Sequence, residues 1–144
     1  MNKIYFIDLN NSLVEKVSGL SIKAEHGDYF RNSLDIPHAV LMTASNPQFS
    51  FGGGIDAKFA EYFPYYCQMK RYRGGGNERI GNIVFSITVD NNYRATKELI
   101  KYAIIFALSQ LCKDETLILS GIGTGIGGLS EDDFCEVLKL VLEE

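Results

Sequence analysis

Two near-continuous apolar runs, each leading into a glycine-rich loop and then into a helical pattern, constrain the fold of this chain more than any other feature. The runs Pro37–Thr43 and Thr116–Ser120 carry no charged residue, as expected for central strands that are covered on both faces. Apolar residues at helical spacing follow in Ile55–Cys67 and Glu131–Leu142. Buried strands that alternate with helices indicate an α/β fold.

The rest of the chain supplies further elements of both kinds. Tyr93–Cys112 repeats apolar residues every three or four positions, which predicts a helix. Pro64 is expected to end or kink the helix predicted at Ile55–Cys67. The basic segment Met69–Arg79 is interpreted as a hairpin tip, which is ordinarily a solvated loop. The remaining predicted elements are strands at Lys3–Leu9, Leu20–His26 and Asn82–Asp90 and a short helix from Ser12.

Polar residues refine two of these elements. In the strand predicted at Asn82–Asp90, Ser86 and Thr88 fall in phase with its first residue, which predicts one wetter face. Ser130, followed three residues later by Asp133, predicts a capping box at the start of the last helix.

Length and composition are those of one globular domain. The 144 residues are 46% hydrophobic and 22% charged, which are ordinary values, and we expect a single domain over residues 1–144. Three widely spaced cysteines without CxxC spacing favour reduced thiols and a cytoplasmic location. The two histidines do not pair with them at ligand spacing, so we expect no metal site, and we expect no cofactor.

The net charge of −4 argues against attraction of DNA or an anionic membrane by the overall field. No apolar run reaches the roughly 18 residues that predict a membrane span. The N-terminal MNKIYFIDLNN alternates and then turns polar, which predicts a first strand and not a signal peptide. A phosphate-bearing ligand is compatible with this charge if backbone N–H groups hold it instead of lysines.

Each of the two apolar strands runs into a loop that could hold a phosphate. The first glycine loop is Thr43–Asp56, with the triplet Gly52–Gly54, and the second glycine loop is Gly121–Ser130, GIGTGIGGLS. Ligands of open α/β sheets bind at the carboxyl ends of the strands, where glycine allows close approach to the main chain and unpaired N–H groups favour an anion. Two such loops suit a diphosphate. Neither matches a Walker A motif or a dinucleotide fingerprint, and an ordinary turn remains the alternative for each.

These segments and their order resemble the macro domain family, whose members bind ADP-ribose. The family's first signature, Asn-Ala-Ala-Asn and then Gly-Gly-Gly-Val, corresponds to Thr43–Asn46 and Gly52–Ile55. Its second signature, Ser-Thr-Gly-Val/Ile-Phe/Tyr-Gly, corresponds to Gly123–Gly128, and its Gly-Asp-Ile to Gly27–Tyr29. The resemblance covers essentially the whole chain and looks closer to the terminal ADP-ribose glycohydrolase branch than to the others.

The resemblance implies a three-layer α/β/α fold with a mixed central sheet and an ADP-ribose cleft at the strand ends. A buried Asp28 would accept a hydrogen bond from the adenine amino group, Tyr29 would offer its backbone N–H, and Asn46 would bond the distal ribose. The two walls of the diphosphate site would be Gly53, Gly54 and Ile55 on one side and Thr124, Gly125, Ile126 and Gly127 on the other.

The chain departs from the family pattern at positions that bear on binding. Thr43 replaces the family's first asparagine, and Pro47 follows the last asparagine of that signature directly. Gly127 stands where an aromatic side chain usually flanks the distal ribose. That wall is missing unless Phe49, Phe51 or another aromatic residue replaces it.

Four functions stay open on the sequence. The favoured one is a binding module for free or macromolecule-linked ADP-ribose. The second is an ADP-ribosyl hydrolase in which Asp56, at a helix start whose exposed N–H groups favour the ionised carboxylate, activates water. The third, not favoured because the chain is acidic, is a single-stranded RNA binder that uses Arg71, Tyr72, Arg73 and Arg79. The fourth is a macro-like scaffold that has lost its ligand.

Overall fold

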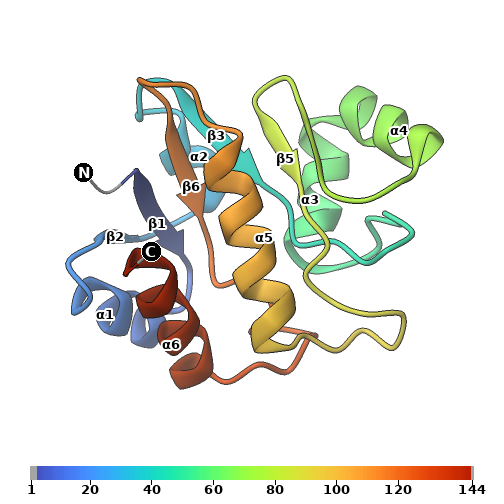
Figure 1. Ribbon diagram of the computed structural model, residues 1–144. Coiled ribbons are helices and arrows are strands. Elements are labelled where there is room, and N and C mark those ends of the chain that lie inside the picture. Colours follow the sequence, from blue (N-terminus) through green and yellow to red (C-terminus); the bar gives the residue numbers. More distant parts are fainter. Residues whose placement is uncertain (1–2, 144) are drawn as a thin grey trace.

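Successive side chains of the central strands enter two separate apolar cores, one on each face of the sheet. Leu117 and Leu119 lie in one core, and Ile118 between them lies in the other. The computed structural model describes residues 3–143. Its elements in chain order (Figure 1) are β1 (Ile4–Asp8), α1 (Asn11–Ser18), β2 (Lys23–His26), α2 (Tyr29–Ser33), β3 (Ala39–Met42), α3 (Gly54–Tyr62), α4 (Pro64–Arg73), β4 (Glu78–Ile80), β5 (Ile83–Phe85), α5 (Lys97–Ser109), β6 (Thr116–Leu119) and α6 (Glu131–Leu142).

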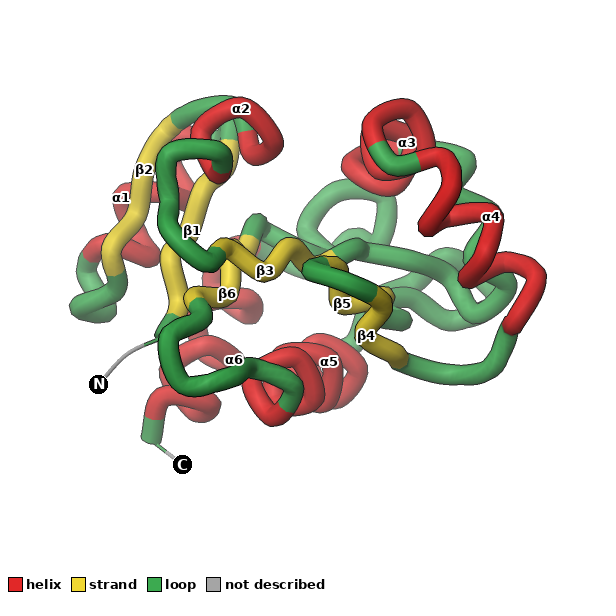
Figure 2. Tube along the Cα trace, turned by 90° about the horizontal axis from the view of Figure 1, so that it is seen from above, coloured by secondary structure: helices red, strands yellow, loops and turns green. Residues whose placement is uncertain are grey.

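Helices cover both faces of the sheet. The core on one face receives buried residues from α1, α5 and α6, among them Phe134. The other core receives Tyr29 of α2, Phe59 of α3 and Cys67 of α4. Viewed from above, the strands run between α5 and α6 on one side and α2, α3 and α4 on the other (Figure 2). The predicted three-layer α/β/α architecture is confirmed.

The sheet has the strand order β2-β1-β6-β3-β5-β4. Neighbouring strands are parallel except β4, which pairs with β5 in the antiparallel sense, so the sheet is mixed as predicted. Because the parallel strands share one direction, their carboxyl ends lie at the same edge of the sheet. Both glycine loops begin at that edge, after β3 and β6.

Pro64 divides the predicted helix over Ile55–Cys67 into two. α3 ends at Tyr62 and α4 begins at Pro64, where the missing N–H group needs no partner. The sequence reading did not anticipate α2, whose five residues are too few for a periodic pattern, or the three-residue strand β4.

The segment predicted as a basic hairpin tip is largely secondary structure, so that prediction was wrong. α4 continues to Arg73, and β4 begins at Glu78. Lys70 is 1% exposed, and its ammonium donates to the carbonyls of Gly74 and Gly76 at 2.8 and 2.7 Å and to the Glu78 carboxylate at 2.9 Å. These bonds hold the end of α4 to the following loop and strand.

The expectation of a wetter face on β5 was also wrong. Ser86 and Thr88 are 0% and 1% exposed. Beyond Phe85 the chain runs along the first glycine loop, where the N–H of Thr88 donates to the carbonyl of Ser45 at 2.9 Å. The loop therefore pairs with the chain beyond β5, and the side chains that the alternation assigned to solvent are buried.

Helix starts follow their capping residues. Thr96 caps α5 through the N–H of Leu99, so the helix begins later than predicted and leaves Tyr93 in the preceding loop. Ser130 accepts from the N–H of Asp133 at 3.1 Å, as its spacing predicts. Within residues 3–143 no helix has both the length and the apolar character needed to cross a membrane.

Candidate functional site

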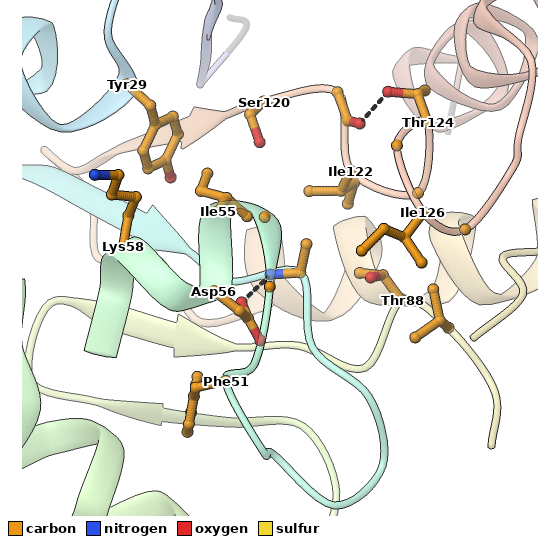
Figure 3. Close-up of a pocket in the computed structure, with 18 of the residues that line it drawn as sticks. Tyr29, Phe51, Ile55, Asp56, Lys58, Thr88, Ser120, Ile122, Thr124 and Ile126 are labelled. Atoms are coloured by element: carbon orange, nitrogen blue, oxygen red, sulfur yellow. Dashed lines mark hydrogen bonds between the residues drawn. The ribbon is translucent and has the colours of Figure 1, made fainter. Parts of the chain in front are cut away.

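A pocket of about 870 Å³ lies along the carboxyl ends of the parallel strands. Its walls come from segments that follow β1, β2, β3, β5 and β6, including both glycine loops. Figure 3 shows Ile55 of the first loop on one side of the pocket and Ile122 and Ile126 of the second loop opposite. The volume falls within the roughly 300–1,000 Å³ of small-molecule sites.

The pocket brings together every residue to which the sequence assigned a role in binding or hydrolysing an ADP-ribosyl group. Their roles themselves stay predictions. The residues are Asp28, Tyr29, Asn46, Gly53, Gly54, Ile55, Asp56, Thr124, Gly125, Ile126 and Gly127.

The first glycine loop presents a helix start without a side-chain cap. Gly53 is the N-cap of α3 and has no side-chain hydrogen bond to offer the first turn. Gly53, Gly54 and Ile55 line the pocket, so this turn carries unpaired N–H groups at the pocket wall. Such a turn favours an anion.

Asn46 takes part in the loop's own hydrogen bonding. Its Oδ1 accepts from the N–H of Ser50 at 3.2 Å, and its Nδ2 donates to the Ser50 hydroxyl at 2.6 Å. This local turn leaves one Nδ2 hydrogen and part of the Oδ1 capacity for a ligand. Asn46, which Pro47 follows directly, therefore lies in the pocket wall with only part of its amide uncommitted.

Arg71 of α4 forms hydrogen bonds with the backbone of the same loop. Phe49 and Phe51 have φ values of 51° and 52°, a left-handed conformation that costs energy for residues other than glycine. The Arg71 guanidinium donates to the carbonyls of Phe49 and Ser50 at 3.3 and 3.1 Å and lies 5.6 Å from the ring centre of Phe51. These contacts stabilise a strained segment beside the pocket.

The glycines of the second loop serve different purposes. A Cβ atom on Gly123 would lie 2.7 Å from Ile100, and one on Gly127 would lie 2.8 Å from the Cβ of Ala95, so close packing requires glycine at both positions. A Cβ on Gly125 would meet nothing within 4 Å. Gly125 is therefore free of packing constraint where it lines the pocket.

Asp28 is exposed, so the expectation of a buried carboxylate was wrong. It is the N-cap of α2, and its Oδ1 accepts from the N–H groups of Phe30 and Arg31, both at 3.0 Å. Oδ2 of Asp28 accepts neither of these hydrogen bonds, so it is available to a ligand at the pocket. The neighbouring Tyr29 side chain is buried, and its hydroxyl donates to the Ile118 carbonyl at 2.6 Å.

No protein-family model matches the chain, and comparison with curated proteins gives no match. Among solved structures, the macrodomain of Mycobacterium tuberculosis DarG matches with a TM-score of 0.67 over 99% of this chain and 91% of that one. The chain has the macrodomain fold. The two sequences are 16% identical, so the likeness concerns the fold, and the assignment to the terminal ADP-ribose glycohydrolase branch stays a prediction.

Asp56 lies under the first glycine loop, not at the surface of the domain. Its carboxylate is 4% exposed and accepts from the N–H of Ala44 at 3.0 Å (Figure 3). Burial raises the pKa of Asp56 from 3.8 to about 6, against the opposing hydrogen bonds from Ser45 and Ala44. The expectation that helix N–H groups favour its ionised form was therefore wrong in direction, because desolvation outweighs them.

Asp8, Thr88 and Tyr93 are among the pocket residues to which the sequence assigned no role in the site. Asp8 at the end of β1 lines the pocket, and its Oδ2 accepts from the N–H of Gly121 at 2.8 Å, which ties β1 to the start of the second loop. Thr88 lines the pocket where the sequence predicted a wet strand face. Tyr93 is a pocket aromatic in the loop before α5; the Asp90-Asn91-Asn92 run before it was the signal for a turn.

The arginines that suggested RNA binding form hydrogen bonds and ion pairs within the domain. Arg71 holds the first loop, Arg73 pairs with Glu78, and Arg79 makes a two-pronged ion pair with Glu115 at 2.6 and 2.7 Å. These contacts argue against a cationic surface for unpaired bases. Within residues 3–143 no three acidic, histidine or cysteine side chains come together to hold a metal ion.

Proposed function

We propose that this macrodomain binds ADP-ribose or an ADP-ribosyl group in the pocket at the strand ends. The observation that carries the proposal is the pair of glycine loops that face each other across that pocket, one of them with an uncapped helix start. In this proposal the diphosphate lies between the loops, where backbone N–H groups bind its oxygens.

The charge of the pocket fits a ligand held by backbone groups. Among the described residues that line the pocket, Lys58 is the one lysine or arginine. Its ammonium lies 3.4 Å from the carboxylate of Glu61. A site that recognised phosphate through cations would need more of them. We expect modest affinity for ADP-ribose, a dissociation constant on the order of 1–100 μM.

Calorimetric titration with ADP-ribose, with ADP and AMP for comparison, tests the proposal. Gly125→Glu should abolish binding, because its side chain enters open space at the pocket wall and brings a negative charge to the diphosphate. Gly76→Glu is the matched control, since its side chain also meets open space but lies outside the pocket. The proposal fails if the wild-type protein shows no heat with millimolar ADP-ribose.

Hydrolysis of an ADP-ribosyl bond is a second candidate function, favoured by one observation. Asp56 lines the pocket and its pKa is raised to about 6, close to the value that suits a general base near neutral pH. Its low exposure means that ligand binding must bring water to it. The test measures release of ADP-ribose from aspartate- or glutamate-linked protein adducts, ADP-ribosylated DNA and O-acetyl-ADP-ribose. Turnover that is lost in Asp56→Ala while ADP-ribose still binds supports an enzyme; no release from any substrate supports a reader.

A further inference from the structure

Thr88 has a buried hydroxyl without a partner at the pocket wall. Its side chain is 1% exposed, and Oγ1 forms no hydrogen bond. Leaving a buried hydroxyl unpaired costs free energy, and such groups are rare in native proteins. Thr88 lines the pocket, so a bound ligand can supply the partner.

The order of the strands indicates which part of the ligand lies there. Along the carboxyl edge the segment after β2 carries Asp28, the loops after β6 and β3 lie in the middle, and Thr88 follows β5. Tyr29, next to Asp28, and Thr88 lie at opposite ends of the pocket in Figure 3. ADP-ribose has the same linear order: a base with its ribose, a diphosphate, and a terminal ribose. In the orientation that the resemblance implies, with the base at Asp28 and the diphosphate between the loops, the terminal ribose lies at the β5 end.

The chemistry of that end suits a sugar. A threonine hydroxyl both donates and accepts, as the hydroxyls of ribose do. Tyr93, five residues further along the chain, also lines the pocket, is 54% exposed and supplies an aromatic ring. Gly127, where the resemblance implies an aromatic wall, has no room for a side chain.

An exposed side chain between the two loops is able to move when a ligand enters the pocket. The Thr88 oxygen is covered in the free protein. Ile126 is 74% exposed, and its Cδ1 would lie 3.4 Å from a Cβ on Gly53, so it reaches from the second loop to the first. A diphosphate between the loops displaces the Ile126 side chain, and a change of rotamer is a small rearrangement.

We infer that the Thr88 hydroxyl forms a hydrogen bond with the terminal ribose of ADP-ribose and thereby distinguishes it from ADP. The inference rests on the proposed function. It makes Thr88 a residue that determines specificity for the part of the ligand by which a macromolecule would be attached.

The test compares Thr88→Val, Thr88→Ser and Ser86→Ala by calorimetry with ADP-ribose and with ADP. Thr88→Val keeps the shape and removes the hydroxyl, so the dissociation constant for ADP-ribose should rise about five- to tenfold while that for ADP stays unchanged. The melting temperature of the free variant should rise by roughly 2–4 °C, since an unpaired buried hydroxyl is lost. Thr88→Ser should keep wild-type affinity.

Ser86→Ala is the matched control. Ser86 carries the other buried hydroxyl without a partner, but it does not line the pocket, so affinity for both ligands should be unchanged. Equal weakening of ADP and ADP-ribose in Thr88→Val, equal losses in Thr88→Val and Thr88→Ser, or wild-type affinity in Thr88→Val would each overturn the inference. Failure of the wild-type protein to bind either ligand would instead overturn the proposed function beneath it.

Discussion

Replacement of Asp56 by asparagine should change how the stability of this protein depends on pH. Asparagine has the same shape and keeps an oxygen that can accept from the N–H of Ala44, as the carboxylate does at 3.0 Å. It cannot ionise. The variant therefore isolates the free energy of placing a charge at a site that is 4% exposed.

The magnitude follows from the raised pKa of Asp56. Burial holds it at about 6 in the folded chain against 3.8 ordinarily, a roughly hundredfold difference in proton affinity, or on the order of 3 kcal/mol. A helix N-terminus stabilises a carboxylate by only about 0.3–1 kcal/mol, so desolvation wins. Because the folded-state pKa is the higher one, the contribution of Asp56 to stability is full below about pH 4 and is lost as pH rises through 6.

Urea unfolding of both proteins from pH 4 to pH 7.5 measures the effect. The free energy of unfolding of Asp56→Asn minus that of wild type should increase by roughly 2.5 kcal/mol over this range, while the titration of other groups cancels. Asp132→Asn, an exposed position in the first turn of α6, controls for the substitution and should change stability by less than about 1 kcal/mol. A difference in the free energy of unfolding that does not change with pH, or that shifts in favour of wild type as pH rises, would refute the reasoning. Asp56 would then be a carboxylate whose ionised form the helix N-terminus stabilises.

Two further substitutions test the proposed base site and the support of the first glycine loop. Asp28→Asn keeps an acceptor for the N–H groups that cap α2 but places an amide donor before the ligand, so the preference for ADP-ribose over its inosine analogue should fall at least about tenfold; an unchanged ratio removes Asp28 from the base site. Arg71→Met should lower the free energy of unfolding by about 1–2 kcal/mol and weaken ADP-ribose binding, because two donors to the strained first loop are lost. Arg73→Met on the same helix, which removes an exposed ion pair, should cost less than about 1 kcal/mol and leave binding unchanged; equal effects of the two would show that Arg71 does not position the loop.

The residues of the site could be found in the sequence because their signals are local. A strand buried on both faces must be apolar along its length, and a loop that approaches a ligand with its backbone must be rich in glycine. Pro37–Thr43 with Gly52–Gly54, and Thr116–Ser120 with Gly121–Gly128, carry both signals within a few residues. Parallel pairing then brings the two strand ends to one edge of the sheet.

The hydrogen bonding and burial of those residues depend on partners that are far apart in the sequence. The carbonyls of Phe49 and Ser50 accept from Arg71, and the N–H of Gly121 donates to Asp8, 113 positions away. The backbone of Thr88 pairs with the loop that follows β3, and its side chain is buried. Alternation could not show that burial, because a strand's exposure is decided by what packs on it.

Asp56 shows the same division most clearly. The sequence by itself determined that a carboxylate stands in the first turn of a helix after a glycine triplet, which is the local setting for a lowered pKa. Only the tertiary structure decided that this carboxylate points under the loop and away from water. Helix-terminus effects act over one turn, whereas desolvation depends on every group that covers the site, and here the second effect is the larger.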